Sequence, residues 1–304
     1  MPHSECRSVP SAPSERLVGY AAILSGAFLF GIWATGGTFA LRSDPNLSPL
    51  ALAWFVQAVS AVAFSPFLRR IQLGGRQWAY TIVAATLGAV LAPSMYFTGL
   101  ALTTPVNAAL LSNTEALFTV VFAFVFLKER LSWRGYLAAA SILVGAVIVT
   151  VDLERPGSGV ASALLGNVLL VLAAAGWGAA NTVSRVVTDR HDIPSYICIQ
   201  LSIGTLILAP LVLLSGGRLS IGAGTLPLAL FLALTSSALF TYLFYLAMRR
   251  IGALQVGAIL STSAVFGVSI AVAFGFSLTA LQALGGAVMA LGVIALYRSP
   301  SPKG

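Results

Sequence analysis

Charged residues are scarce in this chain. They make up 9% of its 304 residues, whereas soluble domains carry roughly 25%. Hydrophobic residues make up 58%, and the mean hydropathy is +0.93. This composition excludes an ordinary globular enzyme and predicts a protein embedded in a membrane.

Cysteine and histidine are also rare, with two residues of each. Cys6 lies in a polar N-terminal stretch and Cys198 inside an apolar run, so no disulfide framework is expected. His3 and His191 are isolated, and no group of residues has metal-ligand spacing, so we expect no metal and no cofactor. No glycine-rich loop ends in Lys-Ser or Lys-Thr, which argues against a pump driven by nucleotide hydrolysis.

The chain is nevertheless basic, with a formal net charge of +8 and a pI of about 10.0. Such a balance is sometimes a sign of nucleic-acid binding. Here the basic residues lie between long apolar runs, where they orient a protein in the bilayer. We therefore expect no nucleic-acid partner.

Ten apolar runs follow one another, each close to the roughly 20 residues that cross a bilayer. Residues 1–16 are expected to form a disordered cytoplasmic tail, and the first run is too long for a cleavable signal peptide. A polar linker at 152–161 separates five runs in residues 17–151 from five in 162–297, and 298–304 form a second cytoplasmic tail. The runs lie near 17–41, 48–68, 77–100, 104–127, 132–151, 162–187, 194–214, 225–247, 252–276 and 279–297.

The positive charges predict how the helices are oriented. If the N-terminus is cytoplasmic, 14 of the 17 Lys and Arg residues fall on the cytoplasmic side. Only Arg42, Arg155 and Arg218 fall on the opposite side. Because cytoplasmic loops carry the Lys/Arg excess, both termini are predicted inside, which requires an even number of spans.

The two halves of the chain resemble each other at a nearly constant offset. Trp33 and Trp177 lie 144 residues apart, and Tyr96 and Tyr242 lie 146 apart. A repeat with an odd number of spans must be inserted upside down relative to its twin, and inverted repeats are typical of secondary transporters. The predicted fold class is therefore an all-α integral membrane protein, with ten transmembrane helices in two inverted five-helix repeats around a site near the midplane.

Residues 101–145 carry a resemblance to a known family. Glu115 lies in the middle of the fourth run, Glu129 and Arg130 lie at its end, and Gly135 opens the fifth. This pattern resembles the EamA-type ten-helix members of the drug/metabolite transporter (DMT) superfamily. The resemblance extends from about residue 17 to 297.

The chain departs from the family pattern at several positions. Ala116 stands where the family usually has a proline, Lys128 replaces a glycine, and Ser263 stands opposite Glu115 in the second half. Family members export amino acids and related metabolites, among other compounds. The resemblance thus implies an exporter of that kind, with a YddG-like exporter of aromatic amino acids as the preferred member.

Glu115 is the only acidic residue inside a predicted span. An intramembrane carboxyl is costly and is by default a hypothesis of function. Burial disfavours its charged form, so Glu115 is a candidate for proton coupling or for binding a substrate ammonium group. The alternative is a neutral carboxyl that bonds between helices, to Asn113, Asn181 or a hydroxyl. In a continuous helix Ser112 shares its face, and Asn107 lies about two turns earlier on a similar face.

Aromatic residues near the middle of the spans form a second candidate set. Interfacial belts are the ordinary location of membrane Trp and Tyr, but Trp33 and Trp177 lie more than halfway along their helices. Their repeat pairing predicts a cavity lining, and ordinary helix packing is the alternative. The predicted substrate cavity comprises Trp33, Tyr96, Ser112, Glu115, Trp177, Asn181, Tyr242 and Tyr245.

These features predict a secondary active transporter that exports small metabolites, foremost amino acids including aromatic ones, by alternating access. Its partners are then a small-molecule substrate and the lipid bilayer, and its location is the bacterial inner membrane. Uptake, another substrate class and a channel-like facilitator remain as alternatives. An intramembrane enzyme is disfavoured because it needs paired catalytic groups within the spans.

Overall fold

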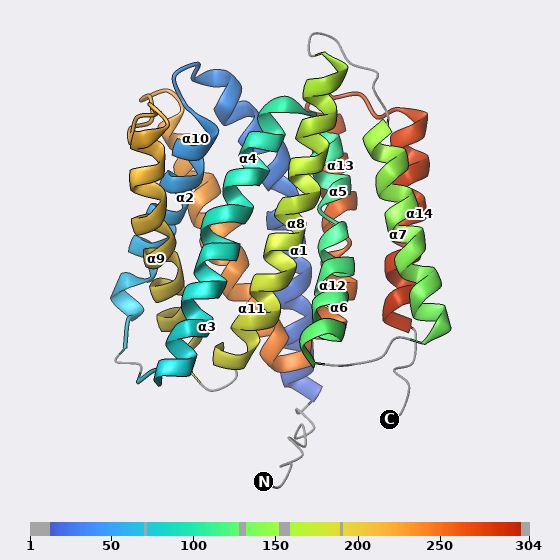
Figure 1. The fold of residues 1–304 in the computed structure, drawn as a ribbon, viewed down its shortest axis with the longest axis horizontal. Coiled ribbons are helices and arrows are strands. Elements are labelled where there is room, and N and C mark those ends of the chain that lie inside the picture. Colours follow the sequence, from blue (N-terminus) through green and yellow to red (C-terminus); the bar gives the residue numbers. More distant parts are fainter. Residues whose placement is uncertain (1–12, 70–71, 128–131, 152–158, 189–190, 299–304) are drawn as a thin grey trace, which may run out of the picture.

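The structure is a computed structural model that describes residues 13–69, 72–127, 132–151, 159–188 and 191–298. Within these ranges the protein is helical and contains no strand. The helices stand side by side in a bundle, and α1 begins at the same end at which α14 finishes (Figure 1).

The helices of the two halves follow the same order. The first half contains α1 (Pro13–Ser43), α2 (Pro49–Phe64), the 3-10 helix η1 (Ser65–Phe67), α3 (Gly75–Ala85), the π-helix η2 (Thr86–Leu91), α4 (Ala92–Leu102), α5 (Pro105–Leu111), α6 (Thr114–Leu127) and α7 (Trp133–Val151). The second half contains α8 (Val160–Thr188), α9 (Ile193–Leu214), α10 (Leu226–Phe231), the π-helix η3 (Leu232–Leu239), α11 (Phe240–Ile251), α12 (Ala253–Leu260), α13 (Ser263–Ala273) and α14 (Ala280–Arg298).

Several helices begin at a polar cap. Ser48, Thr104 and Asp192 each accept a hydrogen bond from a backbone N–H three residues later. A proline follows within the first two helical positions in all three cases. These caps satisfy donors that a helix start leaves open, so the starts of α2, α5 and α9 are fixed by the local sequence.

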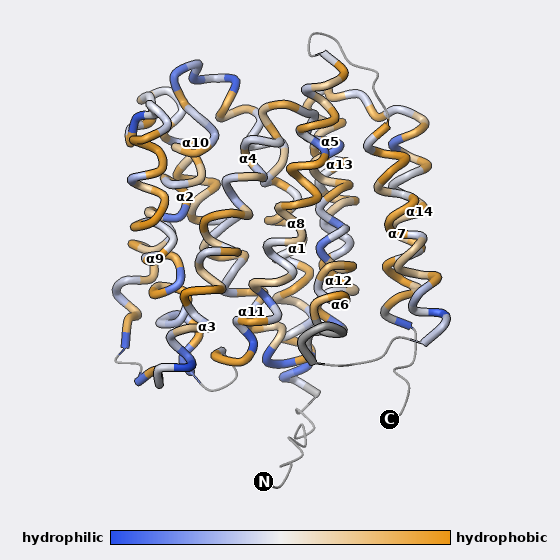
Figure 2. The backbone as a smooth tube through the Cα atoms, viewed as in Figure 1, coloured by the Kyte–Doolittle hydropathy of each residue, from blue (hydrophilic) through white to orange (hydrophobic). Residues whose placement is uncertain are grey.

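Eight helical segments in the described part of the chain are long and apolar enough to cross a membrane, with α12 and α13 counted as one segment (Gln255–Ala273). Residues 280–296 of α14 form a shorter apolar helix. The bundle is largely hydrophobic along its helices, and hydrophilic residues gather toward its two ends (Figure 2). This distribution fits a bilayer around the middle of the bundle.

The fourth and ninth predicted runs are each broken in the middle. Ser112 and Asn113 form a turn between α5 and α6, and Ser261 and Thr262 form a turn between α12 and α13. The expectation of a continuous helix over 104–127 is therefore wrong. The helical face that was to join Ser112 to Glu115 does not continue through this turn.

The packing of the helices is also matched between the halves. Helix α8 packs against α4 and α6, while α1 packs against α11 and α13. The pairs α2–α9 and α7–α14 each join one helix from either half. The first helix of each half thus contacts the third and fourth spans of the other half.

Glycine permits close approaches between these helices. A Cβ atom on Gly99 of α4 would lie 2.7 Å from the carbonyl oxygen of Gly166 in α8, and one on Gly166 would lie 2.9 Å from that of Gly99. Small residues allow membrane helices to pack at such short range.

A buried polar cluster joins α5, α8 and α14 near the end of the bundle opposite the start of α1. Asn107 Nδ2 donates to Asn167 Oδ1 at 3.0 Å, and Gln282 Nε2 donates to Asn107 Oδ1 at 2.7 Å. Thr103 Oγ1 also donates to Asn167 Oδ1, at 2.6 Å. All four side chains are buried, so the cluster ties these helices together away from water.

Candidate functional site

A cavity lies between the two halves near the middle of the bundle. Its empty volume is about 760 Å³, including the part that is open to solvent. Both π-helices contribute to its wall, as do α1, α2, α4, α6, α8, α9 and α11. Its lining residues are Phe30, Trp33, Val56, Gln57, Gly88, Ala89, Pro93, Glu115, Trp177, Ala180, Asn181, Gln200, Leu201, Ser236, Ser237, Phe240, Thr241, Phe244 and Tyr245.

Among the described residues that line the cavity, Glu115 is the only acidic one, and none is Lys, Arg or His. It lies in the first turn of α6, and its side chain is partly exposed. Asn181 Nδ2 of α8 donates to Glu115 Oε1 at 2.7 Å. The carboxyl therefore retains acceptor capacity for a ligand, because a carboxyl group accepts more than one hydrogen bond.

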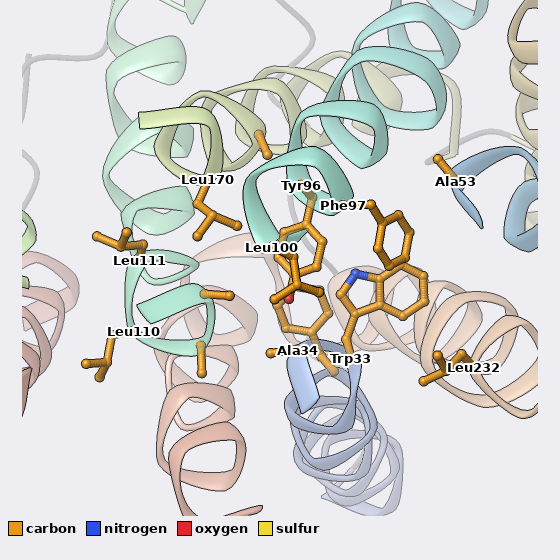
Figure 3. Packing of buried hydrophobic residues seen from close by; sticks show 14 of the residues in the cluster. Trp33, Ala34, Ala53, Tyr96, Phe97, Leu100, Leu110, Leu111, Leu170 and Leu232 are labelled. Atoms are coloured by element: carbon orange, nitrogen blue, oxygen red, sulfur yellow. The ribbon is translucent and has the colours of Figure 1, made fainter. Parts of the chain in front are cut away.

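Aromatic rings form one wall of the site. Tyr96 lies between the two tryptophans, with ring centroids 6.2 Å from Trp33 and 5.3 Å from Trp177. Figure 3 shows Tyr96, Phe97 and the Trp33 indole gathered at the meeting of α1 and α4. Phe30 stacks on Phe240 at 4.8 Å. This wall suits a ligand with an apolar side chain or ring.

Pro93 explains two polar contacts beside the cavity. It has no N–H, so it removes a backbone donor from the carbonyls four and five residues earlier, which are those of Ala89 and Gly88. Gln57 Nε2 donates to Ala89 O at 3.0 Å, and Trp177 Nε1 donates to Gly88 O at 3.2 Å. Two cavity-lining side chains thus satisfy the carbonyls that the π-helix η2 exposes.

The two repeat-related tryptophans differ in their bonding. Trp177 Nε1 has the Gly88 carbonyl as its acceptor, whereas Trp33 Nε1 is buried without a partner among the described residues. The two tryptophans that pair in the sequence repeat therefore do not form equivalent hydrogen bonds in the site.

The sequence matches the model of the EamA-like transporter family twice, over residues 17–151 and 164–298. The chain belongs to the EamA-like transporter family. The two matched segments begin 147 residues apart and cover one set of helices each. The protein is therefore a multi-pass membrane transporter and not an enzyme.

Sequence matches to relatives of this EamA-like transporter cover either most of its length or about half of it. An uncharacterized transporter of Methanothermobacter thermautotrophicus is 28% identical over 302 residues, covering 93% of this chain and 87% of the relative. The uncharacterized transporter YcxC of Bacillus subtilis is 27% identical over 187 residues, covering 56% of this chain and 58% of the relative. A solved crystal structure with 20% identity has a TM-score of 0.65 and covers 97% of this chain and 100% of its own, which shows a shared fold.

Five of the eight predicted site residues line the cavity of this EamA-like transporter. They are Trp33, Glu115, Trp177, Asn181 and Tyr245. Tyr96 lies behind the two tryptophans and is buried.

The other two predicted residues are not among those that line the cavity. Ser112 lies in the turn after α5, where its hydroxyl donates to Ala108 O at 2.7 Å. Tyr242 packs against a buried hydrophobic cluster that includes Phe244. Its neighbour Thr241 reaches the cavity instead, because residues adjacent on a helix point in directions about 100° apart.

Several lining residues were not among the predicted ones. Gln57 and Gln200 were visible in the sequence as polar residues in mid-span. Ser236 and Ser237 lie in η3 and Phe240 begins α11, and a helical periodicity of 3.6 does not place residues correctly around a π-helix. In the described ranges no group of three His, Cys, Asp or Glu residues is arranged to hold a metal ion.

Proposed function

We propose that this EamA-like transporter is a secondary active exporter of small amphipathic metabolites, foremost amino acids with apolar or aromatic side chains. The observation that carries the proposal is the cavity in which Glu115 is the single acidic residue among aromatic rings. A carboxyl group binds a substrate ammonium, and aromatic walls accept its apolar part.

Alternating access is supported by the matched organisation of the two halves. The eight apolar helices, α14 and the α5–α6 pair together supply the ten crossings that we propose. The π-helices, the broken spans and the contacts of α1 and α8 recur in both halves. Two five-span repeats of this kind are inserted in opposite directions, and their rocking exposes a shared site to each side in turn.

The charge distribution supports cytoplasmic termini in the inner membrane of a bacterial cell. In the topology that we propose, fourteen basic residues fall on the side of the termini and three on the other, which agrees with the positive-inside rule. Export is the direction that the family resemblance implies.

The substrate class is tested with purified protein in liposomes. We expect saturable uptake of labelled phenylalanine and leucine, each competing with the other. Labelled glutamate is expected to be a poorer substrate, because its additional carboxylate enters a cavity that has no basic side chain in its lining. Absence of saturable uptake for every amino acid in the panel would contradict the proposed substrate class.

A further inference from the structure

A groove runs along the outer surface between α7 and α14, far from the central cavity. These two helices pack on each other at one edge of the bundle (Figure 1). The groove has an empty volume of about 970 Å³, which includes open space, and its walls include Leu137, Ser141, Val288 and Leu291. Leu137 and Leu291 are 52% and 67% exposed, so this apolar surface lies open at the periphery.

Two arginines stand at one end of this groove. Arg134 lies in the first turn of α7 and Arg298 is the last residue of α14, and both line the groove. Both side chains are exposed. Among the described residues, the groove lining contains no acidic residue, and no carboxylate forms an ion pair with either arginine. In Figure 2 the ends of these two otherwise hydrophobic helices are hydrophilic at this level.

Aromatic residues mark where this end lies in the membrane. Trp133 and Tyr136 of α7 are 74% and 49% exposed. Exposed Trp and Tyr near a helix end occupy the level of the lipid headgroups. Arg134 is next to Trp133 in the chain, so its guanidinium reaches the depth of the phosphates, while the remainder of the groove faces the hydrocarbon layer.

We propose that this groove binds one anionic phospholipid, with its phosphate on Arg134 and Arg298 and an acyl chain along the apolar walls. Guanidinium groups form paired hydrogen bonds with phosphate oxygens, and basic pockets between membrane helices recognise anionic headgroups. A second copy of the chain fits less well. A two-fold axis along the membrane normal would place the arginine pair of one copy against that of the other.

The proposal does not depend on the transported substrate. It depends on the proposed orientation only for the leaflet, which is the cytoplasmic one. Lipid binding and transport are therefore measured separately, and failure of the proposed substrate class would leave the lipid site standing.

The test uses the purified full chain and competition between phosphatidylglycerol and phosphatidylcholine of matched acyl chains, read by native mass spectrometry. We expect Arg134→Gln with Arg298→Gln to weaken phosphatidylglycerol binding by about 30-fold, since each basic residue at an anionic lipid contributes roughly fivefold. The matched control is Arg69→Gln with Arg76→Gln, which removes the same charge at the same end of the bundle. This control is expected to retain wild-type binding.

A second variant tests the groove and not only the charge. Ala295→Phe fills the groove, whose lining includes Ala295, and keeps both arginines. We expect it to lower phosphatidylglycerol binding as well. The proposal is overturned if the arginine variant binds phosphatidylglycerol as the wild type does, or if the control loses as much binding. A lipid-independent dimer that Ala295→Phe disrupts would assign the groove to a second copy instead.

Discussion

Glu115 is the acidic side chain of the cavity and our candidate for both proton coupling and substrate binding. Its partner Asn181 donates a hydrogen bond that either a carboxylate or a neutral carboxyl accepts. The contact is therefore compatible with both a protonated and a deprotonated Glu115. A group that holds a proton in one conformation and a substrate ammonium in the other would couple the two movements.

Glu115→Gln tests this coupling. Glutamine retains the size of the side chain and an acceptor for Asn181, but it has no titratable group. We expect transport driven by a proton gradient to fall at least roughly tenfold, or about 1.4 kcal/mol in activation free energy, and its pH dependence to disappear. The measurement is flux in proteoliposomes at a series of pH values.

The matched control is Glu15→Gln, at the exposed start of α1, where Glu15 pairs with Arg250 at 2.7 Å. This control is expected to keep the wild-type pH profile. An unchanged rate and an unchanged pH dependence in Glu115→Gln would rule out coupling through Glu115.

Trp177→Phe tests the hydrogen bond that the cavity wall makes to η2. Phenylalanine keeps an aromatic ring but leaves the Gly88 carbonyl without the indole donor. We expect a loss of about 1 kcal/mol in the free energy of unfolding relative to Trp54→Phe. Trp54 is the matched control because its Nε1 already has no hydrogen-bond partner among the described residues. Equal losses in thermal unfolding would show that the bond to Gly88 contributes nothing.

The sequence predicted which types of residue belong to the site better than it predicted which side chains face the cavity. Glu115, Trp33 and Trp177 stand out because a carboxyl or an indole in mid-span is unusual. Tyr242 was placed in the cavity by its pairing with Tyr96, but neither tyrosine lines the cavity and Thr241 lines it instead. A π-helix precedes this position in both halves and adds a residue to the turn, so a regular period of 3.6 residues does not predict which side chains face the cavity.

At the scale of the helices, the apolar runs predicted the positions of the spans and missed their interruptions. The length of an apolar run indicates whether it can cross the bilayer. It does not show whether the helix is continuous. Pro93 was visible, yet its consequence for the carbonyls of Gly88 and Ala89 depends on α2 and α8 supplying donors. Such tertiary compensation cannot be obtained from one span alone.

Asn107 illustrates the same limit. Helical periodicity put it on a face similar to that of Glu115, but it belongs to the separate buried cluster with Asn167 and Gln282. We expect Asn107→Leu to lower the free energy of unfolding by about 1–3 kcal/mol, because two buried polar partners lose their bonds.

Thermal unfolding in detergent measures this loss, and hydrogen exchange at the start of α14 reports whether that helix loosens. The control is Asn46→Leu, in the exposed loop after α1, which is expected to be near neutral. If both variants unfold at the wild-type temperature, the cluster does not hold the helices together.

At the scale of the whole molecule, the half-length repeat was the most informative feature of the sequence. It predicted two sets of helices, and the family model matches the chain in two segments. The cavity receives residues from both sets, as a shared site between repeats requires. What the repeat could not predict is the asymmetry within the cavity, where Glu115 has no acidic counterpart and only one of two tryptophans has an acceptor.

Counterflow tests the central claim, which is that the two halves expose one binding site alternately to either side. Liposomes containing the protein are loaded with unlabelled phenylalanine and diluted into a trace of labelled phenylalanine without a proton gradient. Alternating access predicts that label accumulates transiently above its equilibrium level, at a rate that saturates with concentration. Entry of label to equilibrium without an overshoot, at a rate that rises linearly with concentration, would contradict the account and indicate a channel.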